Sequence, residues 1–167
     1  MVRLARSAYL GVAWLFVILI PVQFLLAGAG AFSATFSATM YTPHMYLGLF
    51  LHGLTVALIA FALIGSMPRR ALSFGVLQFI LLTIQVLLVQ LYTPGTALAI
   101  EPPFVSQMFV ATMQPIHNAL AGNSGLVASL HAVNGLAIAG VAVLNLLYAR
   151  RLAQPSPPPA VRLAQPL

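Results

Sequence analysis

The sequence predicts an all-helical membrane protein in which four helices cross the bilayer as an up-down-up-down bundle. Hydrophobic residues make up 61% of the 167-residue chain and charged residues only 5%, and the mean hydropathy is +1.02. A soluble protein of this size needs more polar residues to cover its surface. The chain also contains four apolar runs, each near the roughly 20 residues that a helix needs to cross the hydrocarbon core of a bilayer. We therefore expect a multi-pass membrane protein in direct contact with the lipid bilayer.

The first expected helix covers residues 8–32 and follows Arg3 and Arg6. Basic residues followed by an apolar run also occur in secretory signal peptides. The apolar region of such a peptide spans only about 7–15 residues, whereas this run is long enough to cross a membrane. We therefore expect an uncleaved first helix.

The second and third helices are expected over residues 43–66 and 71–92. Pro43 is suited to the first turn of a helix, where its missing N–H group would have no partner. A basic turn that contains Pro68 separates the two helices, and a run of turn formers after residue 92 ends the third. These breaks define two spans of suitable length.

A long connection, residues 93–125, precedes the fourth expected helix at residues 126–148. Connections of this length usually carry a function or lack order. An amphipathic piece over residues 104–113 predicts a short helix that lies in the membrane interface. The four helices form one membrane domain, residues 1–151, and the Pro-rich residues 152–167 are expected to be a disordered tail because they cannot build a core.

All basic residues of the chain are arginines, and each lies near the end of a predicted helix or beyond it. With four crossings, they all fall on one side of the membrane, and by the positive-inside rule this side is cytoplasmic. Both termini are therefore expected in the cytoplasm. Arginines at helix ends indicate topology rather than a surface for nucleic acid, so we expect no nucleic-acid binding. These residues are Arg3, Arg6, Arg69, Arg70, Arg150, Arg151 and Arg162.

The residue types that the chain lacks exclude several kinds of chemistry. The chain has no cysteine, which excludes disulfides, iron–sulfur clusters, thiolate zinc sites and covalently attached c-type haem. Glu101 is the only acidic side chain, so neither a catalytic pair of carboxylates nor a relay of acidic residues can form. We expect no independent enzymatic activity.

Polar side chains within the apolar helices indicate a site in the outer half of the bundle. At about 1.5 Å per residue, His52 lies about 13 Å below the start of the second helix and His131 about 9 Å below the start of the fourth. Gln23, Gln85 and Asn134 fall at a similar depth. Such side chains are costly in lipid, so they face a protein interior and mark a cofactor site or hydrogen bonds between helices.

One interpretation is a tetrapyrrole held between the second and fourth helices, which are diagonal neighbours in such a bundle. His52 and His131 would be the axial ligands of the iron of a b-type haem. Small residues next to the two rings, Gly48, Thr55 and Gly135, would leave room for a planar group.

Other polar residues would complete this site. Thr55 or Asn134 could accept the second N–H of a ligating ring and fix its tautomer, and Gln23 and Gln85 lie in the same layer. His44 lies nearer the membrane surface and suits the mouth of the site.

Three alternatives remain open for the same residues. One histidine, His52 or His131, could bind the magnesium of a chlorophyll-type pigment. The layer could instead bind a quinone or a lipid headgroup at the outer face. The histidine, glutamine and asparagine side chains could also make only structural hydrogen bonds between helices.

Two stretches carry a resemblance to a known family. One runs from Pro43 to His52 with the pattern P-H-x3-G-x3-H and is preceded by Q-F-L-L-A-G at residues 23–28; the other, L-H-A-V-N-G, covers residues 130–135. They resemble the signatures of a family of small bacterial four-helix membrane proteins catalogued as a domain of unknown function. The resemblance implies this fold and a place in the bacterial inner (cytoplasmic) membrane, but no activity. It puts His44, Gly48, His52, His131 and Asn134 at motif positions.

Two functions follow from these interpretations. A haem iron with two axial histidines has no open position, so such a centre would serve electron transfer rather than oxygen chemistry. Alternatively, the protein is a non-catalytic accessory subunit that packs against other subunits of a larger respiratory or photosynthetic membrane complex.

Overall fold

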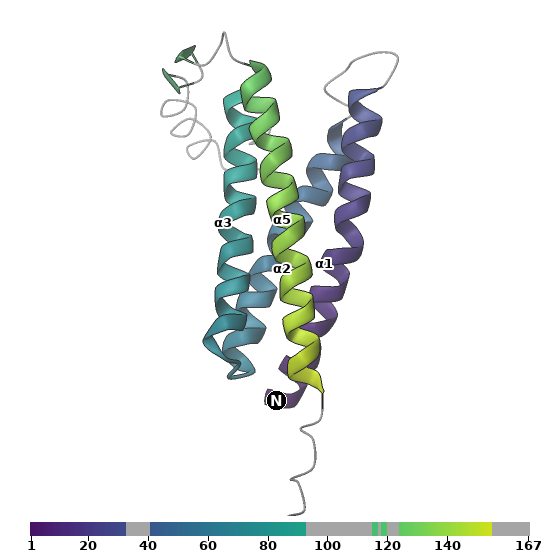
Figure 1. The fold of residues 1–167 in the computed structure, drawn as a ribbon, viewed down its shortest axis with the longest axis vertical. Coiled ribbons are helices and arrows are strands. Elements are labelled where there is room, and N and C mark those ends of the chain that lie inside the picture. Colours follow the sequence, from purple (N-terminus) through teal and green to yellow (C-terminus); the bar gives the residue numbers. More distant parts are fainter. Residues whose placement is uncertain (33–40, 93–114, 117, 120–123, 155–167) are drawn as a thin grey trace, which may run out of the picture.

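Four long helices make up most of the computed structural model, which describes residues 1–32, 41–92, 115–116, 118–119 and 124–154 (Figure 1). Each of these helices is long and apolar enough to cross a membrane, and the described residues contain no strand. The prediction of an all-helical fold with four helices that are long and apolar enough to span a membrane is therefore confirmed. The helices are α1 (Val2–Ala31), α2 (Thr42–Ile64), α3 (Arg69–Tyr92) and α5 (Ser124–Ala153).

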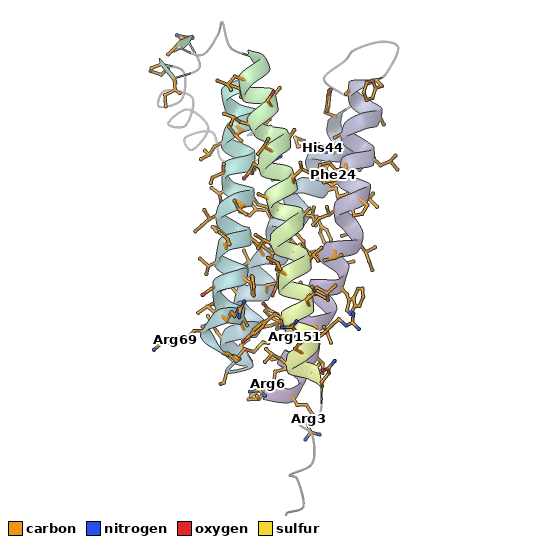
Figure 2. All side chains as sticks on the ribbon, in the orientation of Figure 1. Arg3, Arg6, Phe24, His44, Arg69 and Arg151 are labelled. Carbon is orange, nitrogen blue, oxygen red and sulfur yellow. The ribbon has the colours of Figure 1, made fainter. Side chains whose placement is uncertain are left out.

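The helices form a ring in the order α1, α2, α3, α5, with contacts between all four neighbouring pairs. The diagonal pairs are therefore α1 with α3 and α2 with α5. The N-terminus, the turn between α2 and α3, and the end of α5 lie at one end of the bundle (Figure 1). We call it the arginine end, because it carries the side chains of Arg3, Arg6, Arg69 and Arg151 (Figure 2).

The first and last helices, α1 and α5, extend beyond their expected boundaries at the arginine end. Helix α1 begins at Val2 instead of residue 8, and α5 continues to Ala153 instead of residue 148. Arginine is a good helix former, so the basic flanks continue the helices past the apolar spans. The amphipathic piece at residues 104–113 and residues 155–167 of the expected tail lie outside the described residues.

Two apolar clusters fill the centre of the bundle. Near the arginine end, Tyr9 and Leu58 belong to a buried cluster that includes residues of all four helices. Farther along, Phe16, Leu51 and Ile138 belong to the second. Most other large apolar side chains are exposed on the outside of the bundle, as expected for surfaces that face lipid.

A buried hydrogen-bond network crosses the centre near the arginine end. The Tyr9 hydroxyl lies 3.0 Å from the carbonyl oxygen of Ala71 and 2.6 Å from Asn145 Oδ1, and Asn145 Nδ2 donates to Gln78 Oε1 over 3.1 Å. Tyr9, Gln78 and Asn145 are all fully or almost fully buried. This network ties α1, α3 and α5 together.

Arg6 stabilises the turn that joins α2 to α3. Its Nε donates to the carbonyl oxygen of Gly65 over 3.0 Å, and its Nη2 to that of Ser66 over 3.4 Å. Carbonyl groups at the end of a helix have no partner within the helix. A cation from α1 therefore caps the end of α2, in a turn where Ser66 adopts a positive φ of 44°.

Candidate functional site

Five polar side chains from all four helices meet in the half of the bundle opposite the arginine end. They lie within otherwise apolar spans, and all five are partly buried. We call this group the polar layer: Gln23 of α1, His44 of α2, Gln85 of α3, and His131 and Asn134 of α5. Figure 2 shows the position of His44 along the bundle, far from the labelled arginines.

Gln23 and His44 join α1 to α2 by two reciprocal contacts. The Gln23 amide donates from Nε2 to the carbonyl oxygen of His44 over 2.9 Å, and His44 Nδ1 lies 3.0 Å from the carbonyl oxygen of Gln23. Because a carbonyl oxygen only accepts, Nδ1 of His44 carries the proton in this contact. The other nitrogen, Nε2, therefore keeps its lone pair and accepts from Gln23 Nε2 over 3.4 Å.

Gly48 makes this approach of Gln23 possible. A Cβ atom at position 48 would lie only 3.1 Å from Gln23 Nε2, which is tighter than an ordinary van der Waals contact. The absent side chain thus gives the glutamine room to reach across to α2.

Gln85 and Asn134 make the corresponding connection between α3 and α5. Gln85 Nε2 donates to the carbonyl oxygen of His131 over 3.0 Å. Asn134 Nδ2 donates to Gln85 Oε1 over 2.5 Å and to the carbonyl oxygen of Leu81 over 2.8 Å. Gly135 is less constrained than Gly48, because an added Cβ would meet Phe24 at 3.5 Å and Gln85 at 3.7 Å, both ordinary contacts.

The rings of His44 and His131 face each other between the two connected pairs of helices. Their centroids are 6.2 Å apart, and their planes are tilted by 57°. His131 Nδ1 and Gln23 Oε1 are buried atoms with no hydrogen-bond partner among the described residues. The polar layer therefore brings together two imidazoles from diagonal helices and two polar atoms that could bind a further group.

His52 lies at a different interface, between α2 and α3. Its Nε2 is 3.2 Å from Thr83 Oγ1, and its ring centroid is 4.7 Å from that of Phe79. The Thr83 hydroxyl donates to the carbonyl oxygen of Phe79 over 2.9 Å, so its oxygen accepts the proton on His52 Nε2. Thr55 donates to the carbonyl oxygen of His52 over 2.7 Å and so does not orient the His52 ring.

The histidine of α2 that lies next to His131 is thus His44, and not His52 as the depth estimate suggested. The estimate counted residues from the start of each helix and assumed that both helices start at the same level. In Figure 1, α5 extends further than the start of α2 at this end of the bundle. His131, deeper along α5, therefore meets a residue in the first turn of α2.

The histidines and acids of the described residues form no group of three or more that could hold a metal ion. His117 and Glu101 lie outside the described residues. Within the described part, the possible ligands are consequently the facing pair of His44 and His131 and the separate His52.

Comparison with known proteins identifies one related family. No curated protein and no solved structure matches the chain. The region that does match a family includes Gln23, His44, Gly48, His52 and Gln85, and it ends before α5 begins. The expected similarity to a catalogued domain of unknown function is confirmed, because residues 23–94 match a family described as "Family of unknown function (DUF6220)".

Proposed function

We propose that this small four-helix membrane protein binds a b-type haem in the polar layer, with His44 and His131 as axial ligands, and transfers electrons. The observation that carries the proposal is the 6.2 Å separation of two imidazole rings contributed by diagonal helices. We also propose that the protein lies in the bacterial cytoplasmic membrane with the arginine end in the cytoplasm, since arginines concentrate on that side.

The ring separation suits a metal centre between the two histidines. Imidazole nitrogens bind transition metals at about 2.0–2.1 Å, which puts two opposed nitrogens about 4 Å apart and the ring centroids roughly 6 Å apart. The observed 6.2 Å agrees with this value.

The hydrogen bond of His44 also favours ligation. Metal-binding histidines usually donate the N–H of their second nitrogen to a carbonyl or carboxylate, which fixes the tautomer. His44 Nδ1 makes such a contact with the carbonyl oxygen of Gln23 over 3.0 Å. Its Nε2 keeps the lone pair that a metal would bind, and the 3.4 Å contact with Gln23 Nε2 is the bond that ligation would replace.

The number of protein ligands favours a tetrapyrrole over a bare ion. A structural zinc site needs about four protein ligands, whereas a haem iron takes only two from the protein because the macrocycle supplies the others. The facing pair of His44 and His131 meets that requirement without a third ionisable ligand. With both axial positions occupied, the bound group would exchange electrons and would not bind oxygen.

Visible spectroscopy of the full-length protein tests this assignment. We expect protein purified from haem-supplied cells to show a Soret band, and His44→Ala and His131→Ala each to lose the bis-histidine spectrum. His52→Ala is the matched control and should keep the spectrum, because the His52 ring contacts Thr83 and Phe79 and not His131. The absence of a Soret band in the unmodified protein would reject haem. Loss of the spectrum in His52→Ala, but not in His44→Ala, would reject His44 as the ligand.

The same experiment separates haem from the other ligands of this layer. A magnesium pigment would give a long-wavelength absorption band and would need only one of the two histidines. A quinone would extract into organic solvent and leave no Soret band. Either result would replace the haem proposal.

A second candidate function is an accessory subunit of a larger membrane complex. It is favoured by the hydrogen bonds that the polar layer already makes, since Gln23, Gln85 and Asn134 connect neighbouring helices without any ligand. Such bonds are worth about 0.6–2 kcal/mol each in membranes and would give the layer a structural role. Mild extraction followed by size measurement tests this function, and a stable monomer without co-purifying subunits would count against it.

A further inference from the structure

An arginine and the single tryptophan of the chain form a contact on the outer surface of the bundle. The guanidinium carbon of Arg150, near the end of α5, lies 5.7 Å from the ring centroid of Trp14 on α1. Arg150 is exposed, and 43% of Trp14 is exposed. The contact therefore spans two neighbouring helices on a surface that faces the lipid.

The described residues offer this arginine no anionic partner. They include six arginines but no aspartate or glutamate, because the only acidic side chain, Glu101, lies outside them. The other anchored arginines also use neutral groups: Arg6 binds carbonyl oxygens, and Arg70 lies over the rings of Phe74 and Tyr148. The arginine end is thus a set of fixed positive charges that needs anions from outside this part of the chain.

The geometry of Arg150 favours one class of anion. A cation–π contact with an aromatic ring uses the charge of the guanidinium and leaves its N–H groups available as donors. These donors match the oxygens of a phosphate in a bidentate arrangement. Because the ring already holds the guanidinium in place, less side-chain entropy is lost when the phosphate binds.

The position of the pair along the helices indicates a lipid phosphate. Helices α1 and α5 each contain 30 residues and are therefore about 45 Å long, whereas the hydrocarbon core of a bilayer is about 30 Å thick. Their ends consequently extend into the headgroup regions. Arg150 is in the last turn of α5, whereas Trp14 lies about 18 Å along α1 from its first residue, so the contact joins a helix end to the apolar part of the bundle.

Exposed apolar residues continue from this pair toward the middle of the bundle. On α1, Ile18 is one turn beyond Trp14 and is 59% exposed; on α5, Leu147 and Val143 precede Arg150 on the same helix face and are each 45% exposed. An acyl chain attached to a phosphate at Arg150 would run along this surface.

We propose that Trp14 and Arg150 form a binding site for the phosphate headgroup of an anionic phospholipid, with an acyl chain along Ile18, Leu147 and Val143. Charge complementarity selects an anionic lipid over a zwitterionic one, and cation binding to anionic headgroups strengthens with each arginine near the membrane surface. The site is independent of the polar layer and of any group bound there.

The single tryptophan provides a direct measurement. The full-length protein is reconstituted in phosphatidylcholine vesicles that contain either brominated phosphatidylglycerol or brominated phosphatidylcholine, and quenching of Trp14 fluorescence reports which lipid lies beside it. We expect the anionic lipid to be about fivefold enriched at Trp14. Equal quenching by the two lipids would overturn the proposal.

Variants separate a specific site from the general positive charge of this end. Arg150→Gln should abolish the enrichment, whereas Arg69→Gln, which removes the same charge from the start of α3, should leave most of it. Equal losses in the two variants would overturn a specific site at Arg150. Arg150→Lys keeps the charge but not the planar donor edge, so it should retain only part of the enrichment, and full retention would overturn the bidentate arrangement.

Two controls tie the quenching to a bound lipid headgroup. Each variant is compared by its ratio of quenching with the two lipids, so that an effect of residue 150 on the emission of Trp14 itself cancels. Inorganic phosphate, added at constant ionic strength, should not reduce the ratio. A reduction would show that the site takes free phosphate and would overturn the assignment to a lipid.

Discussion

The imidazole rings of His44 and His131 lie 6.2 Å apart, centroid to centroid, although they belong to diagonal helices of the bundle. Diagonal helices contact each other only through side chains that reach across the centre of the bundle, as these two rings do. The other hydrogen bonds of this layer are made by glutamine and asparagine side chains. The main-chain carbonyl of Gln23 accepts from the His44 ring, and the Gln23 side chain donates to the backbone of His44. Gln85 binds the backbone of His131. The stability of the polar layer can therefore be tested independently of any ligand.

Gly48→Ala should destabilise the protein through Gln23. The new Cβ would lie 3.1 Å from Gln23 Nε2, so the amide must shift and its bond to the backbone of His44 must lengthen. We expect a loss of about 1 kcal/mol in the free energy of unfolding, measured in mixed micelles with increasing SDS.

Gly53→Ala is the matched control for this change, because it lies on the same helix and its Cβ would meet nothing within 4 Å. Alanine is favoured over glycine within a helix by up to about 1 kcal/mol. The control should therefore be neutral or more stable. If the two variants were equally stable, the close approach of Gln23 to Gly48 would contribute nothing to the free energy of unfolding.

Asn134→Ala should weaken the connection between α3 and α5 in the polar layer. The change removes the donor to Gln85 Oε1 and to the carbonyl oxygen of Leu81, and we expect the free energy of unfolding to fall by about 1–2 kcal/mol. Leu136→Ala on the same helix should have little effect, since this side chain is 65% exposed to the surroundings of the bundle. A larger effect at Leu136 would contradict the assigned helix face.

Tyr9→Phe should destabilise the network near the arginine end. The variant keeps the ring and removes only the hydroxyl that contacts Ala71 and Asn145, so the expected loss is about 1 kcal/mol. Asn145→Leu should cost more, because it leaves both the Tyr9 hydroxyl and Gln78 Oε1 without this partner. Tyr46→Phe, at a residue that is 57% exposed, is the control, and a loss of equal size there would rule out a special role for Tyr9.

Arg6→Met should weaken the turn between α2 and α3. Methionine preserves the apolar part of the side chain but cannot donate to the carbonyl oxygens of Gly65 and Ser66, and we expect a loss of about 1 kcal/mol. Arg3→Met removes the same charge from an exposed position and should be nearly neutral. Thermal unfolding of both variants in the same detergent gives the comparison, and equal shifts would mean that charge alone determines the effect.

The sequence was sufficient to predict the four spans, because the length of an apolar run determines whether a helix can cross a bilayer. It was also sufficient to predict that Gln23, Gln85, His131 and Asn134 lie at a similar depth. It could not decide which histidine of α2 meets His131. Which histidine lies next to His131 depends on how far α5 extends beyond α2 and on the rotation of α2 about its axis. Neither quantity can be read from the spacing of residues along a single helix.

Tyr9 was missed for a related reason. A tyrosine close to two arginines at the start of an apolar run has the pattern of an interfacial residue, yet the structure buries it completely. Depth counted from the arginine end would have revealed it, because Tyr9, Gln78 and Asn145 all lie a similar number of residues from that end. The histidines, which lie near the opposite end, give no information about this level of the bundle.

The hydrogen bonds of the polar layer divide the bundle into two halves. Gln23 joins α1 to α2, and Gln85 and Asn134 join α3 to α5, whereas bonds between the two halves lie deeper, at His52 with Thr83 and at Tyr9 with Asn145. Moving the two halves apart at the level of the polar layer would therefore leave the hydrogen bonds within each half intact. A flat molecule inserted between His44 and His131 would separate the two halves without replacing any of these bonds.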